Sequence, residues 1–69
     1  MIMEMISKKK LYEAMLAKGY NERQLAKATK INPFTISQML QKDSCIRLSS
    51  LARLTNALGC RAEELIINV

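Results

Sequence analysis

The residue types that carry enzyme chemistry are scarce in this chain of 69 residues. It has no histidine and a single aspartate, Asp43, so it lacks the acid–base pair that most catalytic sites need. Its two cysteines, Cys45 and Cys60, lie fifteen residues apart without companion ligands, and they match neither a zinc spacing nor an activated nucleophile. We therefore expect no enzymatic activity, no metal ion and no cofactor.

The chain does carry positive charge, and that charge is unevenly placed. Residues 7–47 hold nine Lys and Arg against three acids, a net charge of +6, whereas residues 48–69 are neutral overall. This distribution favours a polyanionic partner for the first two thirds of the chain. The alternative is a basic surface that only keeps the protein in solution.

The length of the chain allows one domain with a small core, for which oligomerisation is the expected source of extra stability. Residues 1–6 form an apolar N-terminal arm that is too short for a signal peptide or a membrane span. We expect a cytoplasmic protein without a membrane partner, in which both cysteines are ordinary reduced thiols. A redox role for Cys60 is the alternative.

Apolar spacing and capping residues predict helices over about residues 8–18, 22–28, 33–41, 48–58 and 62–66, with residues 42–47 as a polar loop. Ser7, Asn21 and Asn32 are the expected N-caps, and Gly19 and Gly59 the expected C-caps. Leu25 and Ala28 are expected to point inward, and residues 29–31 form the turn between the second and third helices. Residues 21–40 thus have the pattern of a helix-turn-helix motif, two short helices joined at a sharp angle.

Three stretches carry a resemblance to a known family: Gly-Tyr-Asn-Glu-Arg-Gln-Leu-Ala at 19–26, Ile-Ser-Gln-Met-Leu at 36–40, and the spaced leucines of 51–66 with Gly59. Together they resemble the Xre family, the phage Cro and repressor-type helix-turn-helix DNA-binding domains, over about residues 7–66. The resemblance implies an all-α, five-helix lambda-repressor-like fold at 7–66, with residues 67–69 as a tail. Short β-strands at the apolar termini are compatible with it.

The resemblance also implies a site, because the second helix of the motif enters the DNA major groove in this family. The base-reading positions carried over are Asn32, Pro33, Phe34, Thr35 and Gln38. Asn21, Arg23, Lys42 and Ser44 fall at phosphate-binding positions, and the run Lys8, Lys9 and Lys10 is added because cations are misplaced at a helix N-terminus.

The chemistry of the base-reading residues supports these roles. Gln38 can pair bidentately with adenine, Thr35 can bond a base, and Phe34 can pack on thymine methyl groups. Pro33 can only shape or exclude. Alternatively, Phe34 is a core aromatic, Gln38 is merely exposed, and the lysine run is a solvated face.

The chain departs from the family pattern at three places. Lys30 stands where glycine is common, so a left-handed conformation there carries strain of about 1 kcal/mol. Glu22 replaces an amide and would repel phosphate. Met15 and Leu40 replace an arginine–glutamate pair, and we predict that they touch, since exchanging both partners for apolar residues is often neutral.

The sequence therefore predicts a regulator of transcription, most simply a repressor, that binds a near-palindromic operator in double-stranded DNA as a homodimer. We expect Ile66, Ile67 and Val69 at the dimer interface, with strand pairing from residues 2–6 as an addition. The alternative is an antitoxin-like or other protein-interaction subunit with the same fold, and a regulatory protein partner is compatible with either.

Overall fold

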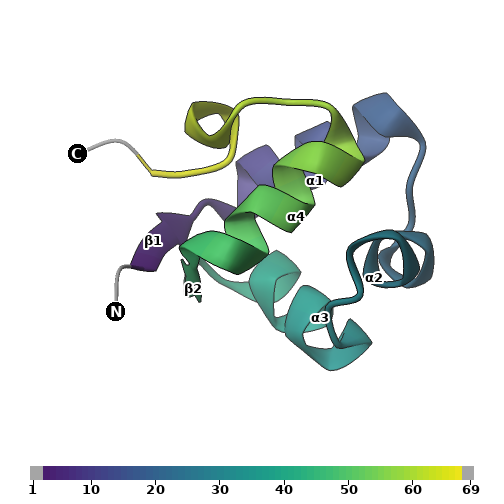
Figure 1. Cartoon of the computed structure of the whole chain (residues 1–69), viewed down its shortest axis with the longest axis horizontal. Coiled ribbons are helices and arrows are strands. Elements are labelled where there is room, and N and C mark those ends of the chain that lie inside the picture. The colour runs from purple at the N-terminus through teal and green to yellow at the C-terminus, as the bar shows by residue number, and fades with distance from the viewer. Residues whose placement is uncertain (1–2, 68–69) are drawn as a thin grey trace.

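The structure is a computed structural model, and it describes residues 3–67 of the chain. Its elements are β1 (Met3–Ile6), α1 (Lys8–Lys18), α2 (Glu22–Thr29), α3 (Pro33–Gln41), β2 (Ser44–Arg47), α4 (Leu48–Leu58) and the short 3₁₀ helix η1 (Ala62–Glu64). Figure 1 shows the helices arranged around a common centre, with the two strands beside each other at one edge.

The predicted capping residues set the helix boundaries. The Ser7 hydroxyl oxygen accepts a hydrogen bond from the backbone N–H of Lys10 at 3.3 Å, so it caps α1. At α2, the Asn21 side chain accepts from the Gln24 N–H at 2.8 Å, and the Gln24 side chain accepts from the Asn21 N–H at 3.0 Å. Gly19 ends α1 with φ 80°, a conformation that favours glycine.

One core holds the elements together. Its buried members are Ile6, Leu11, Met15, Leu25, Ala26, Ile36, Met39, Ile46, Leu51, Leu54, Leu58 and Leu65. Each described helix and strand except η1 contributes at least one of them. The small side chain of Ala26 lies in this core, as expected for close helix crossing. This shared core fixes the position of α3 relative to the rest of the molecule.

The two strands correct one prediction. β1 and β2 pair antiparallel, with Glu4 opposite Ile46 and Ile6 opposite Ser44, so residues 44–47 are a strand and not a loop. Ile46 is buried while its neighbours Cys45 and Arg47 are exposed, which is the alternation of a half-buried strand. Cys45 and Ile46 are adjacent apolar residues, so the segment shows no clear apolar–polar alternation in the sequence.

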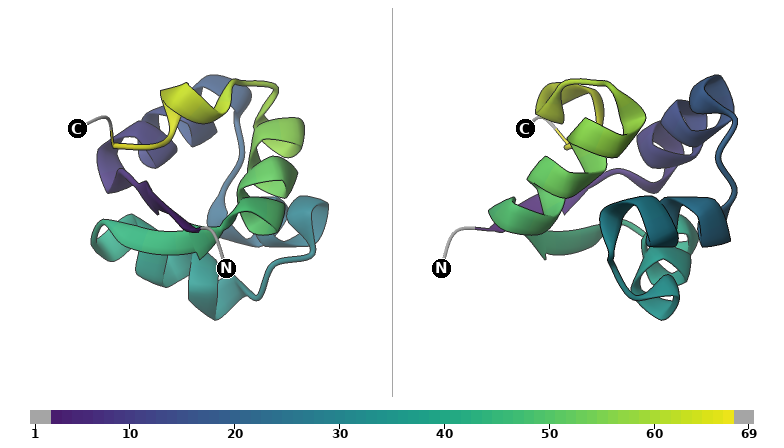
Figure 2. Two further views of the ribbon diagram at one scale, coloured as in Figure 1. Left: turned by 60° about the vertical axis from the view of Figure 1, so that its left-hand side comes forward. Right: turned by 45° about the vertical axis from the view of Figure 1, so that its right-hand side comes forward.

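The other edge of β1 is occupied by the C-terminal segment. Ile6 forms an antiparallel bridge with Ile66, the Ile67 N–H donates to the Met5 carbonyl oxygen at 2.9 Å, and the Ser7 N–H donates to the Leu65 oxygen at 2.9 Å. Figure 2 shows the C-terminal segment returning to the start of the chain. The described part of the apolar arm, Met3–Ile6, is therefore a strand within the fold, in keeping with the short β-strand that was compatible with the resemblance.

The prediction of five helices was wrong at its last member. Residues 62–66 were expected to form a helix, but the described chain contains only the three-residue η1 there. The reason is the bridge to β1, because Ile66 must be extended to pair with Ile6. Across residues 3–67, no helix is long and apolar enough to cross a membrane.

Candidate nucleic-acid interface

The angle between α2 and α3 is set by Thr29 and Lys30. Thr29 is buried, and its hydroxyl donates to the Leu25 carbonyl oxygen at 2.7 Å while accepting from the Ile31 N–H at 3.3 Å. Lys30 follows with φ 58° and ψ 29°, and it is the one non-glycine residue with positive φ in the described chain. Lys30 thus adopts the left-handed conformation that carries strain in a residue other than glycine.

The inward face of α2 differs from the prediction by one residue. Ala28 was expected to point inward but is exposed, whereas Thr29 is buried. The helix also continues through Thr29, which was expected in the turn. The buried hydroxyl is tolerated because its hydrogen bonds are made within the motif itself.

The face of α3 that points away from the core carries the expected base-reading residues. Ile36 and Met39 are buried on the core side, whereas Phe34 and Gln38 are exposed and Thr35 is half-buried. Phe34 is 68% exposed, so the alternative that it belongs to the core is wrong. The structure thus leaves an aromatic ring and polar side chains on one accessible helix face.

The start of α3 is arranged by Asn32 and Pro33. The Asn32 side-chain oxygen accepts from the Phe34 N–H at 2.8 Å, which caps the helix, and Pro33 occupies the first turn where it needs no N–H partner. Both side chains are exposed. The cap uses the oxygen of Asn32, so its amide NH₂ group is left to act as a donor towards a base or a phosphate.

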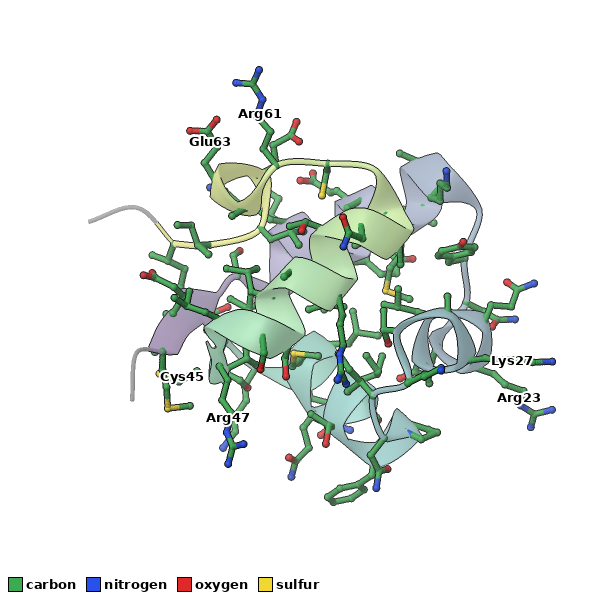
Figure 3. All side chains as sticks on the ribbon, viewed as in Figure 1. Arg23, Lys27, Cys45, Arg47, Arg61 and Glu63 are labelled. Atoms are coloured by element: carbon green, nitrogen blue, oxygen red, sulfur yellow. The ribbon has the colours of Figure 1, made fainter. Side chains whose placement is uncertain are left out.

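Exposed cations lie on both sides of α3. Figure 3 shows Arg23 and Lys27 pointing outward from α2, and Arg47 pointing outward from β2. Lys42 follows α3 and is also exposed, while the Ser44 hydroxyl donates to the Lys42 carbonyl oxygen at 3.0 Å. Lys27 and Arg47 are exposed cations that were not among the predicted site residues. The four-residue spacing from Arg23 to Lys27 places these two cations on one face of a helix, whereas the assignment of residues 42–47 to a loop gave Arg47 no defined position.

The three lysines at the start of α1, Lys8, Lys9 and Lys10, have different surroundings in the structure. The Lys8 N–H donates to the Asp43 carboxylate at 2.9 Å, so a distant acid supplies the negative charge that the first turn of α1 lacks. The Lys10 ammonium donates to the Ile66 carbonyl oxygen at 2.9 Å and to that of Glu63 at 3.4 Å. Lys10 is thereby held at the C-terminal segment, whereas the Lys8 and Lys9 side chains are exposed.

The cations around α3 have no acidic partners in the described chain. The ion pair found within residues 3–67 joins Arg61 and Glu63 at 3.4 Å, and both of these side chains are largely exposed. No group of three His, Cys, Asp or Glu in this part of the chain is arranged to hold a metal ion. Arg23, Lys27 and Lys42 are therefore available to phosphate oxygens.

Met15 and Leu40 line the same groove between α1 and α3, so their side chains are not on different faces of the domain. That they touch stays a prediction. Tyr12 and Leu16 are 56% and 62% exposed at the rim of the groove.

The cysteines have different surroundings. Cys45 is exposed on β2, and Cys60 is half-buried after α4. Burial, and to a smaller extent the negative charge of Glu64, raises the pKa of the Cys60 thiol above its ordinary value.

The residues expected at a dimer interface are used inside the chain where they are described. Ile66 and Ile67 are half-buried against β1 through the hydrogen bonds given above, and Val69 lies outside the described residues. Strand pairing likewise occurs between β1 and β2 of one chain.

Comparison with known proteins adds one finding. The sequence profile of the Cro/C1-type HTH DNA-binding domain matches residues 10–69, which includes α1 from Lys10 onward, the whole α2–turn–α3 motif and all later elements. No curated protein and no solved structure matches the chain significantly. Four α-helices with a helix-turn-helix at α2 and α3 agree with this profile. The chain belongs to the family of Cro/C1-type HTH DNA-binding domains.

Proposed function

We propose that this chain is a sequence-specific transcriptional regulator that binds a near-palindromic operator as a homodimer, with α3 in the major groove. The exposed face of α3 carries this proposal. Phe34 and Gln38 are exposed, while Ile36 and Met39 are buried and hold the helix on the core. Repression by blocking polymerase is the simplest mechanism for a domain of this size.

Base recognition is assigned to the first two turns of α3. Gln38 can form two hydrogen bonds with adenine, and such a bidentate pair discriminates against other bases by about 1–3 kcal/mol. Thr35 reaches a base through its hydroxyl or a thymine through its methyl group. Phe34 offers only apolar contact, so thymine methyl groups are its preferred target. Pro33 has no polar group to bond a base, so it restricts the operator sequence only by sterically excluding some bases.

Phosphate binding is assigned to the cations on either side of α3. Arg23, Lys27 and the N-terminal end of α2 face one DNA strand, with Asn21 at the helix start. Lys42 and Ser44 face the other strand. Glu22 at the first position of α2 interacts favourably with the helix dipole and keeps phosphate from a closer approach.

Selection from random duplex DNA tests this proposal, because it returns both the operator and its symmetry. On the selected operator, Gln38→Ala is expected to relax preference at one position of each half-site. Lys42→Ala is expected to weaken all sequences alike. Identical behaviour of the two variants would contradict the assigned roles.

Salt dependence separates DNA binding from the protein-interaction alternative. Each neutralised phosphate contributes about −0.9 to the slope of log affinity against log salt, so the three cations Arg23, Lys27 and Lys42 of each subunit in a dimer give a slope of about −5. A chain that selects no sequence and shifts no DNA, but forms a salt-insensitive complex with another protein, would be an interaction subunit instead.

A further inference from the structure

We propose that two copies of the chain join along the open edge of β2, forming one continuous antiparallel sheet, and that this is the interface of the homodimer. The inference rests on the dimer of the proposed function and names its surface. β1 lies between β2 and the C-terminal segment, so its two edges are occupied. In the described chain, the backbone of β2 pairs with β1 alone, and no hydrogen bond from another element covers its outer edge.

The surface beside this edge is apolar. On the outer face of the sheet, Met5 stands opposite Cys45 and Met3 opposite Arg47. Met3 and Met5 are 48% and 38% exposed, and Leu48 directly after β2 is 44% exposed. An open strand edge next to exposed apolar side chains is a template for another strand, which proteins normally cover or charge. A second β2 supplies that strand.

Symmetry restricts how two β2 strands can pair. A two-fold axis that relates neighbouring antiparallel strands is perpendicular to the sheet, so both cores lie on the same side of it. Directly opposite residues share a face of the sheet. The axis must therefore pass between one residue of β2 and the same residue of the second copy, placed directly opposite. Near the centre of the strand this residue is either Cys45 or Ile46.

Side-chain matching selects Cys45. With Cys45 on the axis, Met5 and Cys45 of one copy and Cys45 and Met5 of the second copy form one apolar row across the outer face of the sheet. Arg47 of each strand then lies opposite position 43 of the second copy, just outside β2, where the exposed Asp43 accepts a hydrogen bond from the Lys8 N–H of its own chain. With Ile46 on the axis, Arg47 faces Cys45 of the second copy and interrupts the apolar row.

The size of the chain brings two copies on one operator close enough for direct contact. Recognition helices that read half-sites one DNA turn apart lie about 34 Å from each other. The described chain measures 28 × 21 × 21 Å, so two copies at that spacing are neighbours. Sharing a sheet edge joins them without using the exposed face of α3.

A charge introduced at the two-fold axis tests the interface. Sedimentation equilibrium of the full chain without DNA measures the dimer dissociation constant. Cys45→Glu places two glutamates opposite each other, and we expect the dimer dissociation constant to rise at least about tenfold. Leu16→Glu makes the same change at an exposed position of α1 and is expected to leave that constant unchanged. Melting curves of both variants verify that they fold.

Cross-linking supplies a second, independent measurement. Diamide takes two electrons and two protons from two thiols and leaves a disulfide. Two variants with one cysteine each are compared. The Cys60→Ser variant keeps Cys45 alone, and the control carries Leu16→Cys in a chain whose Cys45 and Cys60 are both replaced by serine. We expect the Cys45 variant to form a covalent dimer at least about tenfold faster than the control. The reason is that thiols held together react at an effective concentration near millimolar.

The results distinguish this interface from the proposed function. A monomer at high micromolar concentration, a dimer unaffected by Cys45→Glu, or cross-linking no faster than that of the control would each overturn the interface. If such a protein still binds a symmetric operator, the proposed function stands with another interface. If the dimer behaves as expected but selects no DNA sequence, the interface stands and the function fails.

Discussion

Lys30→Gly is expected to make the protein more stable while it weakens DNA binding. Lys30 has φ 58° between α2 and α3, where a side chain is strained. It also carries a positive charge beside the start of the recognition helix. The substitution removes both, so stability and affinity should change in opposite directions.

The size of the stability change follows from two opposing terms. The left-handed conformation costs a non-glycine residue about 1–2 kcal/mol. Glycine loses more backbone entropy on folding, which offsets about 0.5–1 kcal/mol of that gain. The free energy of unfolding should therefore rise by about 1 kcal/mol, which raises Tm by about 4–8 °C in a domain of this size.

Two substitutions serve as controls in urea denaturation. Lys30→Ala keeps the Cβ atom and removes the charge, so its stability should stay near that of the wild type while its DNA affinity falls as in Lys30→Gly. Gly19→Ala adds a Cβ atom at φ 80°, where no atom lies within 4 Å of it. It should lower the free energy of unfolding by about 1 kcal/mol through conformation alone.

Equal stabilities of Lys30→Gly and Lys30→Ala would refute the reasoning, because they would show that the conformation of Lys30 carries no strain. Unchanged DNA affinity in both variants would show that the Lys30 charge does not contribute to binding. The two conclusions are independent, since one rests on denaturation and the other on affinity.

Three further predictions concern single side chains. Thr29→Val removes the buried hydrogen bond to the Leu25 oxygen and should lower the free energy of unfolding by about 1–3 kcal/mol in urea titrations, whereas Thr29→Ser should lose less. Phe34→Ala should leave Tm nearly unchanged because the ring is exposed, yet weaken binding to operators with thymine at the contacted position, as gel shifts would show. Cys60 should react with iodoacetamide more slowly than exposed Cys45 at pH 8, because its raised pKa leaves less thiolate, and the difference should shrink as the pH rises. Mass spectrometry of the two labelled sites measures it, and equal rates would contradict the prediction.

The helices could be predicted from the sequence because their signals are local. Ser7, Asn21 and Asn32 each cap the helix that follows, and the buried residues of α3 and α4 recur at helical spacing. The helical spacing of the buried residues also predicts which face of α3 is exposed, so Phe34 and Gln38 were placed correctly as accessible side chains. Whether they read bases stays a prediction.

The features that were missed depend on residues far apart in the chain. Nothing near Ser44 shows that Met3–Ile6 will pair with it, and nothing near Lys10 shows that its ammonium will meet the Ile66 carbonyl oxygen. Asp43 capping Lys8 is of the same kind. Such contacts arise from the packing of the whole domain, and the periodicity of apolar residues within one helix does not predict them.

The pairing of β1 with β2 has a consequence for the order of folding. It joins Ile6 to Ser44 across a loop that contains α1, α2 and α3. Closing a flexible loop of that length costs about 3 kcal/mol of chain entropy beyond a constant. The strands should therefore meet after the helices have collapsed, so Ile6→Val should speed unfolding and leave the folding rate nearly unchanged in stopped-flow measurements. The buried residues of α2 and α3 would then form the folding nucleus, and the recognition helix would take its place before the sheet that completes the domain.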